Sequence, residues 1–171
     1  MLSLPEAMKE EFAFICMMPV LDTAALLHWP VERIAGGIAA HSQLAELERL
    51  SPERAMLVES IEMEWMSIGT GDAEDAARRT GDLPRLSEVD LEVLALAIAT
   101  GQCLFTDDYS LQNVCRSLNH PFEAVSNRPS KKQWAWELRC IGCRATKQAD
   151  SKDAQECEIC GSPMEVKRAR R

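Results

Sequence analysis

Short apolar runs recur along the first three-quarters of the chain and predict buried strands. The clearest is FICMMPVL at 14–21, in which Pro19 indicates an irregularity near the end. Similar runs occupy 102–106 and 122–125, and 38–40 is a candidate for a further short strand. These four segments are the strands that the pattern predicts.

Segments with apolar residues at helical spacing separate those runs. Ser51-Pro52 should begin a helix over about 53–66, because proline suits the first helical position and the apolar residues keep helical spacing. Those apolar residues are Met56, Leu57, Ile61 and Trp65. The Ser87-x-x-Asp90 sequence resembles a capping box and should open an apolar helix that ends near Thr100. The other predicted helices are 23–28, which Pro30 should interrupt, 42–50 with Ser42 as N-cap, a short polar helix between Gly71 and Gly81, and a helix capped by Asp107 or Asp108 that ends at Leu118.

The alternation of strands and helices predicts an α/β fold, in which helices flank a parallel sheet. In such sheets ligands bind at the carboxyl ends of the strands. A polar segment with a proline follows the last predicted strand and is typical of a linker. The predicted organisation is a domain over 14–127, a linker over 128–135, a small module over 136–165 and a basic tail over 166–171. Residues 1–13 have no assigned role.

Four of the seven cysteines form two close pairs in the small module. Two residues separate Cys140 from Cys143 and Cys157 from Cys160, and thirteen residues lie between the pairs. A two-residue gap lets a tight turn direct both sulfurs at one ion, so we expect one structural zinc ion in a closed site of four thiolates. A module this short and hydrophilic could not fold without it. Two disulfides or a redox pair are the alternatives, and neither suits a chain without a secretory signal.

Composition and charge add limits on location and partners. No stretch reaches 18 consecutive apolar residues, so we expect no membrane span and a reducing, cytoplasmic location. The remaining cysteines, Cys16, Cys103 and Cys115, lie in apolar runs and should be core residues. Residues 1–127 carry 8 Lys+Arg and 21 Asp+Glu, a net charge of -13, whereas residues 128–171 carry 11 and 6, a net charge of +5. A basic module can hold phosphates even in an acidic protein.

Two tryptophans precede the first cysteine pair. Trp134 and Trp136 could stack on RNA bases, but packing of a small module on its neighbour is the more common role and the one we expect.

Carboxylates stand at the ends of several predicted elements. Asp22 follows the first strand, Asp107 and Asp108 follow the run at 102–106, and Asp90 and Glu46 lie in the first turns of helices. In a parallel α/β fold these ends can converge on one edge, where grouped carboxylates require protons or a divalent cation. Oxygen ligands select Mg²⁺ or Mn²⁺, and such ions can activate water for phosphodiester hydrolysis. Taken singly, the acids also suit helix caps or solvated helix positions.

Several short sequence motifs resemble those of a known family of nucleases. The words VLDTAALL at 20–27, LSEVDLEVLALA at 86–97 and LFTDDYSLQNV at 104–114 closely resemble the motifs of PIN-domain nucleases. Together with RRTGDL, WELRCIGC and CEICG, they resemble the Nob (Nin-one-binding) family, the archaeal and eukaryotic endonuclease that matures the 3′ end of small-subunit ribosomal RNA. The resemblance covers nearly the whole chain beyond residue 13.

The resemblance implies a PIN fold, a C-terminal zinc ribbon and a set of metal-binding acids. It carries over directly to Asp22, Asp90 and Asp108, and Asp107 either assists or only caps. Glu46 matches the helix-borne glutamate of the family. Ala40-His41, however, stand where Thr-Pro is usual, so Glu48 is the alternative. Arg144 replaces a frequent glycine in the first cysteine turn, which does not affect the zinc prediction.

We therefore interpret the chain as a metal-dependent endoribonuclease that uses Mg²⁺ or Mn²⁺. The ribbon and the basic tail, Lys167 to Arg171, are expected to position precursor small-subunit ribosomal RNA or the small ribosomal subunit, and an assembly-factor protein is a candidate partner. Two alternatives remain. A toxin-type PIN ribonuclease usually lacks a zinc module, and a non-catalytic RNA- or ribosome-binding adaptor would not need all the acidic positions.

Overall fold

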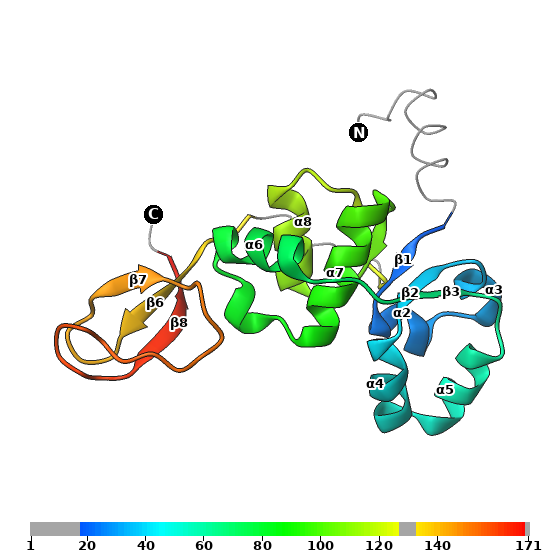
Figure 1. Cartoon of the computed structure of the whole chain (residues 1–171), viewed down its shortest axis with the longest axis horizontal. Helices are drawn as coiled ribbons and strands as arrows, with labels where there is room; N and C mark the ends of the chain where they lie inside the picture. The colour runs from blue at the N-terminus through cyan, green and yellow to red at the C-terminus, as the bar shows by residue number, and fades with distance from the viewer. Residues whose placement is uncertain (1–17, 127–132, 170–171) are drawn as a thin grey trace.

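A computed structural model describes residues 18–126 and 133–169 of the 171-residue chain (Figure 1). The predictions made for residues 14–17, for Cys16, for residues 128–132 of the linker and for the last two residues of the basic tail lie outside the described residues.

The first domain contains a five-stranded parallel sheet with strand order β3-β2-β1-β4-β5, which confirms the predicted α/β class. The strands are β1 (Val20–Leu21), β2 (Ile38–Ala40), β3 (Glu64–Met66), β4 (Leu104–Phe105) and β5 (Phe122–Glu123). β1 is central, and its Val20 pairs with Ile38 on one side and Leu104 on the other. Neighbouring strands are therefore distant in sequence, as parallel pairing with helical crossovers requires.

Helices pack on both faces of this sheet (Figure 1). Along β1, Val20 packs into a core formed mainly with α6, α7 and α8, whereas Leu21 packs into a second core with α2, α4 and α5. Successive residues of a strand point to opposite faces, which explains this division. The helices are α2 (Thr23–His28), α3 (Val31–Ile34), α4 (Ser42–Leu50), α5 (Pro52–Glu59), α6 (Gly71–Thr80), α7 (Glu88–Thr100) and α8 (Tyr109–Ser117), with a 3-10 turn η1 (Leu83–Arg85) before α7.

The predicted helix over 53–66 is wrong in its second half. α5 ends at Glu59, and β3 occupies residues 64–66 at the edge of the sheet. Met56 and Leu57 are 72% and 45% exposed, so the helical spacing does not mark a buried face. The sequence E-M-E-W at 62–65 alternates polar and apolar residues, and this period of two is the strand signal that the helical interpretation missed.

The capping predictions are confirmed at three of four helices, and Ser51 is the N-cap residue of α5, with Pro52 as the first helical residue. Asp108 caps α8, and Ser87 and Asp90 form a reciprocal capping box at the start of α7. Ser42, however, is the first residue of α4 and not its N-cap. His41 precedes it in a helical conformation, and the Ser42 hydroxyl is buried with no partner among the described residues.

The C-terminal module is a three-stranded antiparallel sheet with order β7-β6-β8. Its strands are β6 (Trp136–Cys140), β7 (Thr146–Gln148) and β8 (Met164–Arg168). It extends from the side of the first domain on which α6 lies, and a Lys152–Glu88 ion pair of 2.6 Å joins the two parts (Figure 1). Arg78 adds a second link, because its Nε donates to the Asp150 carbonyl. No helix within 18–126 or 133–169 is long and apolar enough to cross a membrane.

Candidate active site and metal-binding cysteines

Three of the predicted acids gather where two central strands end. Asp22 follows β1, Asp108 lies three residues after β4, and Asp90 is in the first turn of α7. Because β1 and β4 are adjacent and parallel, the residues that follow them meet at the same edge of the sheet. Asp90 and Asp108 both add to the negative potential that Asp22 experiences, so the three carboxylates form one electrostatic group.

Asp22 is the most buried member of this group, at 7% exposure. Its Oδ1 accepts a hydrogen bond of 2.7 Å from the Thr23 amide, and its Oδ2 accepts one of 2.5 Å from the Thr106 hydroxyl. Burial raises the pKa of Asp22 to about 7; the two threonine bonds oppose the rise, and the neighbouring carboxylates reinforce it. A carboxylate that burial and like charges destabilise in this way binds either a proton or a cation at neutral pH.

Thr106 connects two of the acids through one hydroxyl. The oxygen that donates to Asp22 also accepts a bond of 3.0 Å from the Asp108 amide. Asp108 then caps α8, and its Oδ1 accepts from the Ser110 and Leu111 amides. Burial raises the pKa of Asp108, the amides lower it, and the nearby charge of Asp90 adds to the rise.

One carboxylate oxygen of Asp90 takes part in the capping box of α7. Its Oδ2 accepts from the Ser87 amide at 2.8 Å and from the Ser87 hydroxyl at 2.7 Å, which fixes the rotamer of the side chain. No hydrogen bond is formed by Oδ1 within the part of the chain that the structure describes. Asp90 can therefore cap α7 and still offer an oxygen at the shared edge.

Glu46 reaches the group through Thr23, the residue after Asp22. Its Oε2 accepts a bond of 2.6 Å from the Thr23 hydroxyl, and buried Gln43 donates to the same hydroxyl at 3.3 Å and to the Leu21 carbonyl at 3.0 Å. Glu48, the alternative, is exposed on the same helix. The structure therefore brings Glu46, and not Glu48, to the Asp22 end of the site.

Asp107 faces a different part of the fold. Its two carboxylate oxygens accept from the Ser126 amide at 3.1 and 3.2 Å, so it fastens the chain after β5. It does not cap α8, because Asp108 holds that position.

Sequence reasoning missed the neutral residues that hold these acids in place. Thr23, Thr106 and Gln43 are all buried, and each bonds to a carboxylate or to the residue beside one. The two threonines stand directly next to acids in the words VLDT and FTDD, and that adjacency was the available signal.

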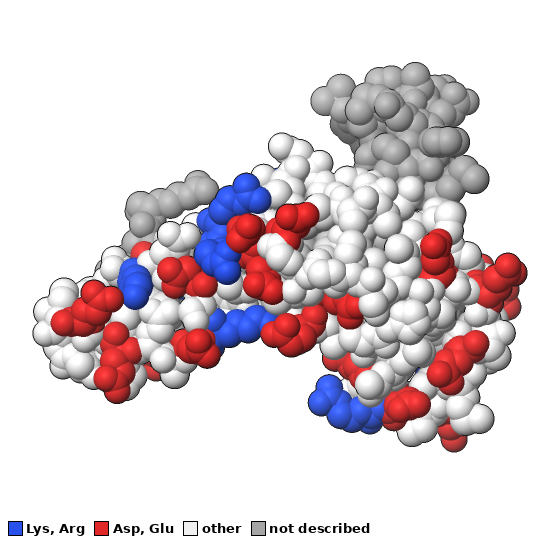
Figure 2. Space-filling model, viewed as in Figure 1, with Lys and Arg blue, Asp and Glu red and all other residues white. Residues whose placement is uncertain are grey.

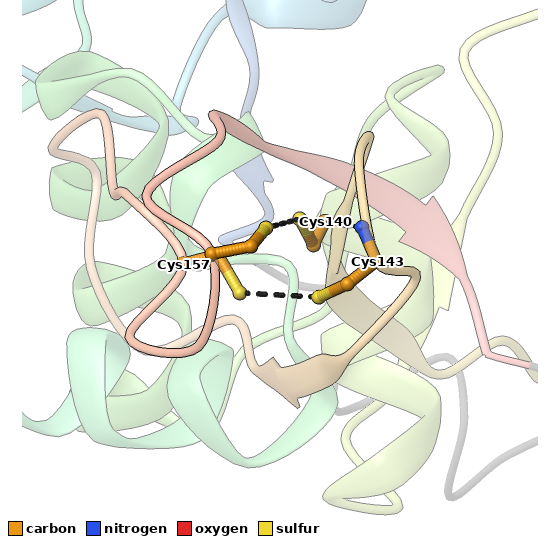
Figure 3. A group of neighbouring side chains, drawn as sticks. Cys140, Cys143 and Cys157 are labelled. Atoms are coloured by element: carbon orange, nitrogen blue, oxygen red, sulfur yellow. Dashed lines mark hydrogen bonds between the residues drawn. The ribbon is translucent and has the colours of Figure 1, made fainter.

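The four predicted cysteines meet at one point of the ribbon. Their sulfurs lie within 4.8 Å of one another, and in the described residues no carboxylate group of three or more meets that limit. Cys140 and Cys160 sulfurs are 3.4 Å apart, and those of Cys143 and Cys157 are 3.5 Å apart. Figure 3 shows the side chains of Cys140, Cys143 and Cys157 turned toward one another from two facing loops.

The loops around these cysteines donate hydrogen bonds to two of the four sulfurs. The amides of Gly142 and Cys143 donate to the Cys140 sulfur at 3.3 and 3.4 Å. Hydrogen bonds from Ser162 lower the pKa of Cys160 to about 6. Arg144 adopts a φ of 65°, in the left-handed region where glycine is usual, so its side chain is accommodated with some backbone strain. Four convergent thiolates can hold one metal ion such as zinc in a closed site.

The two tryptophans pack against the first domain and the ribbon. The Trp134 amide and carbonyl bond to the side chain of Asn113 in α8, and Arg168 stacks on the Trp134 ring. The Trp136 ring is half-buried under Arg85, with 4.1 Å between the guanidinium carbon and the ring centroid. Cys103 and Cys115 are fully buried core residues, as predicted.

Charge is distributed unevenly over the surface. Figure 2 shows acidic side chains scattered over the first domain, while the basic side chains visible in that view gather mainly where the ribbon meets α6.

Comparison with known proteins finds several archaeal ribonucleases, whereas no family model matches the chain. Endoribonuclease Nob1 of Methanocaldococcus jannaschii is 31% identical over 160 residues, covering 90% of this chain and 79% of that protein. Endoribonuclease Nob1 of Methanothermobacter thermautotrophicus is 30% identical over 169 residues, covering 91% and 96%. Ribonuclease VapC1 of Thermoplasma acidophilum is 34% identical over 160 residues, covering 89% and 78%.

Proposed function

This chain belongs to the Nob1 family of endoribonucleases, and from that premise we propose that its substrate is the precursor of small-subunit ribosomal RNA. Cleavage of a phosphodiester bond in that precursor would mature the 3′ end of the RNA. The observation that supports the site is the gathering of several acidic side chains at the sheet edge. Burial and the neighbouring acids raise the pKa of Asp22 there to about 7.

The proposed catalytic ligands are Asp22, Asp90, Asp108 and Glu46, with Asp107 outside the group that they form. The donor set is oxygen alone, which fits Mg²⁺ or Mn²⁺, and the repulsion among the buried acids is what a divalent cation would relieve. When bound, the ion supplies a water of lowered pKa and stabilises charge on the leaving oxygen. Thr106 orients Asp22 and Asp108 together, and Thr23 orients Asp22 and Glu46.

The four cysteines are proposed to hold one structural zinc ion. Four thiolates leave no open coordination position, so the ion would support the ribbon and take no part in hydrolysis. The parts are assigned as a nuclease domain over 14–127, a linker over 128–135, a zinc ribbon over 136–165 and a basic tail over 166–171. The positive excess of residues 128–171 lies in the linker and the tail. Ribbon and tail together would hold the RNA or the small ribosomal subunit in the cytoplasm, beside a candidate assembly factor.

A toxin-type ribonuclease is the second candidate, because the VapC1 relative matches 89% of this chain and therefore more than the nuclease domain. The two functions differ in substrate and not in chemistry. A non-catalytic adaptor is disfavoured by the assembled carboxylate group.

The decisive test is cleavage of a single-stranded RNA that spans a small-subunit 3′ end, compared with transfer RNA and with an unrelated single strand. We expect cuts at one position of the first RNA with Mg²⁺ or Mn²⁺. Asp22→Asn should lower the rate by several factors of ten with no loss of folding, since the amide keeps the shape but removes an anionic ligand. Cutting of transfer RNA or of the unrelated strand as fast as the first RNA would favour the toxin-type function, and unchanged cleavage by Asp22→Asn would refute the active-site assignment.

A further inference from the structure

Arg85 lies beside the cluster of acids formed by Asp22, Asp90 and Asp108. The proposed chemistry does not yet give this cation a role. It lies in η1, is exposed, and donates from Nε to the Ser110 hydroxyl at 3.1 Å. Ser110 is the residue whose amide bonds to Asp108, so Arg85 is one side chain removed from a proposed metal ligand. In the described residues, no carboxylate oxygen lies within 4.0 Å of its guanidinium nitrogens.

The other face of Arg85 is covered by the C-terminal module. The Trp136 ring lies 4.1 Å from the guanidinium carbon, and Trp136 is the first residue of β6. Its backbone passes directly over Gly81, where an added Cβ would lie 2.3 Å from the Trp136 carbonyl oxygen. The close approach therefore depends on a glycine at this position.

A buried carboxylate holds the start of this segment in place. Asp82 is fully buried, and its Oδ2 accepts a bond of 2.6 Å from the Asn113 side chain. Asn113 also bonds to the backbone of Trp134 through its Oδ1 and Nδ2, at 2.7 and 2.8 Å. The segment that enters the ribbon is thus fastened to α8, the helix that Asp108 begins.

We propose that Arg85 binds a phosphate of the RNA strand next to the scissile bond, and that the ribbon positions it there through Trp136. The bond to Ser110 and the stacked ring fix the plane of the guanidinium and leave both terminal NH₂ groups for an anion, a geometry suited to bidentate phosphate binding. The nuclease domain is strongly acidic and repels RNA, so a fixed cation at its carboxylate edge offsets that repulsion where the strand must enter. This inference rests on the proposed function and specifies how the same site holds its substrate.

The test compares Arg85→Ala, Arg85→Lys and Trp136→Ala in the full chain, with Arg33→Ala as the matched control. Arg33 is also exposed and stacks on a tryptophan, Trp29, at 3.5 Å, but it lies in α3 before the amino end of β2. Binding of the small-subunit RNA is measured by fluorescence anisotropy at several salt concentrations without added Mg²⁺ or Mn²⁺. Cleavage is then measured with the divalent ion present, and the melting temperature of each variant is recorded.

Loss of one phosphate contact should lower the slope of log affinity against log salt by about 0.7 for Arg85→Ala. We expect kcat/KM to fall about tenfold or more, as for a lost hydrogen bond to a charged group. Arg85→Lys should keep the slope and lose part of the rate, because a lysine retains the charge without the planar fork. Trp136→Ala should keep most of the slope and lower the rate, because the cation remains but is no longer held.

A purely structural role for the stacked pair would lower the melting temperature of Arg85→Ala and leave the salt slope at the value of Arg33→Ala, and that result would overturn the proposal. Cleavage by the parent with an unchanged kcat/KM in Arg85→Ala would also overturn it while leaving the proposed function intact. Failure of the parent itself to cleave or bind the RNA would count against the proposed function.

Discussion

Replacing Asp22 by asparagine should change the pH dependence of folding stability as well as the activity. Burial raises the pKa of this carboxyl from 3.8 to about 7 in the folded chain. A carboxyl whose folded pKa is raised binds its proton more tightly in the native state, so native stability is lost as pH rises from about 4 to about 7 and is constant above that. The full rise corresponds to about 4 kcal/mol, which is an upper bound because the carboxylate can draw in water or a cation.

The amide should fit the same position. The Thr23 amide can still donate to its oxygen, and the Thr106 hydroxyl, which accepts from the Asp108 amide, has a second lone pair for the new NH₂ group. We therefore expect Asp22→Asn and the parent to be about equally stable near pH 4.5. At pH 8 without divalent ions the variant should be more stable by about 2–4 kcal/mol.

Urea denaturation followed by helical circular dichroism measures this difference in the nuclease domain, because every helix of the described residues ends before residue 118. Addition of Mg²⁺ or Mn²⁺ at pH 8 should stabilise the parent and not the variant, since only the parent keeps the full ligand set. If the free energies of unfolding of the two proteins changed in parallel between pH 4.5 and 8, the conclusion that burial and acidic neighbours raise the pKa of Asp22 would be refuted.

Three further predictions concern the ribbon and Asp107. Metal analysis should find about one zinc per chain, and zinc removal or Cys140→Ser should unfold the ribbon while the helical signal persists; folded protein without zinc would exclude the metal site. Truncation before Arg128 should weaken RNA binding and flatten its salt dependence, and equal slopes for both proteins would reduce the ribbon to a structural accessory. Asp107→Asn should retain at least half of the cleavage rate, because the Asp107 oxygens accept from the Ser126 amide, away from the other acids. Inactivation as strong as that of Asp22→Asn would instead place Asp107 in the site.

The parts of the fold that the sequence predicted have strong local signals. The capping box of α7 and the aspartate cap of α8 are fixed by side chains that bond to their own helix ends, so residue type and spacing were enough. β3 was missed because its polar–apolar alternation spans only four residues and lies next to apolar residues at helical spacing, while the strand that it pairs with, β2, is distant in sequence. Ser42 was misplaced by one residue because His41 is already helical, which no local pattern indicated.

The sequence indicated which acidic residues belong to the candidate site, but not how their side chains are arranged. The acids at element ends were recognised because parallel strands bring their carboxyl ends together. Their division of roles required the tertiary structure. Asp107 and Asp108 are adjacent in sequence, yet one fastens Ser126 and the other caps α8 beside Asp22. The stacking of Arg85 on Trp136 likewise depends on contact between two domains.

The central position of β1 has a consequence for the protein during its own synthesis. β1 is made early, but its partner β4 and the Thr106 hydroxyl that orients Asp22 follow about 84 residues later. Chains fold from the amino end as they emerge, and long-range pairing must wait for the later partner. A nascent chain that has exposed only β1, β2 and β3 therefore carries Asp22 and Glu46 without Asp90 or Asp108. The proposed site is thus incomplete until most of the length of the chain has been released.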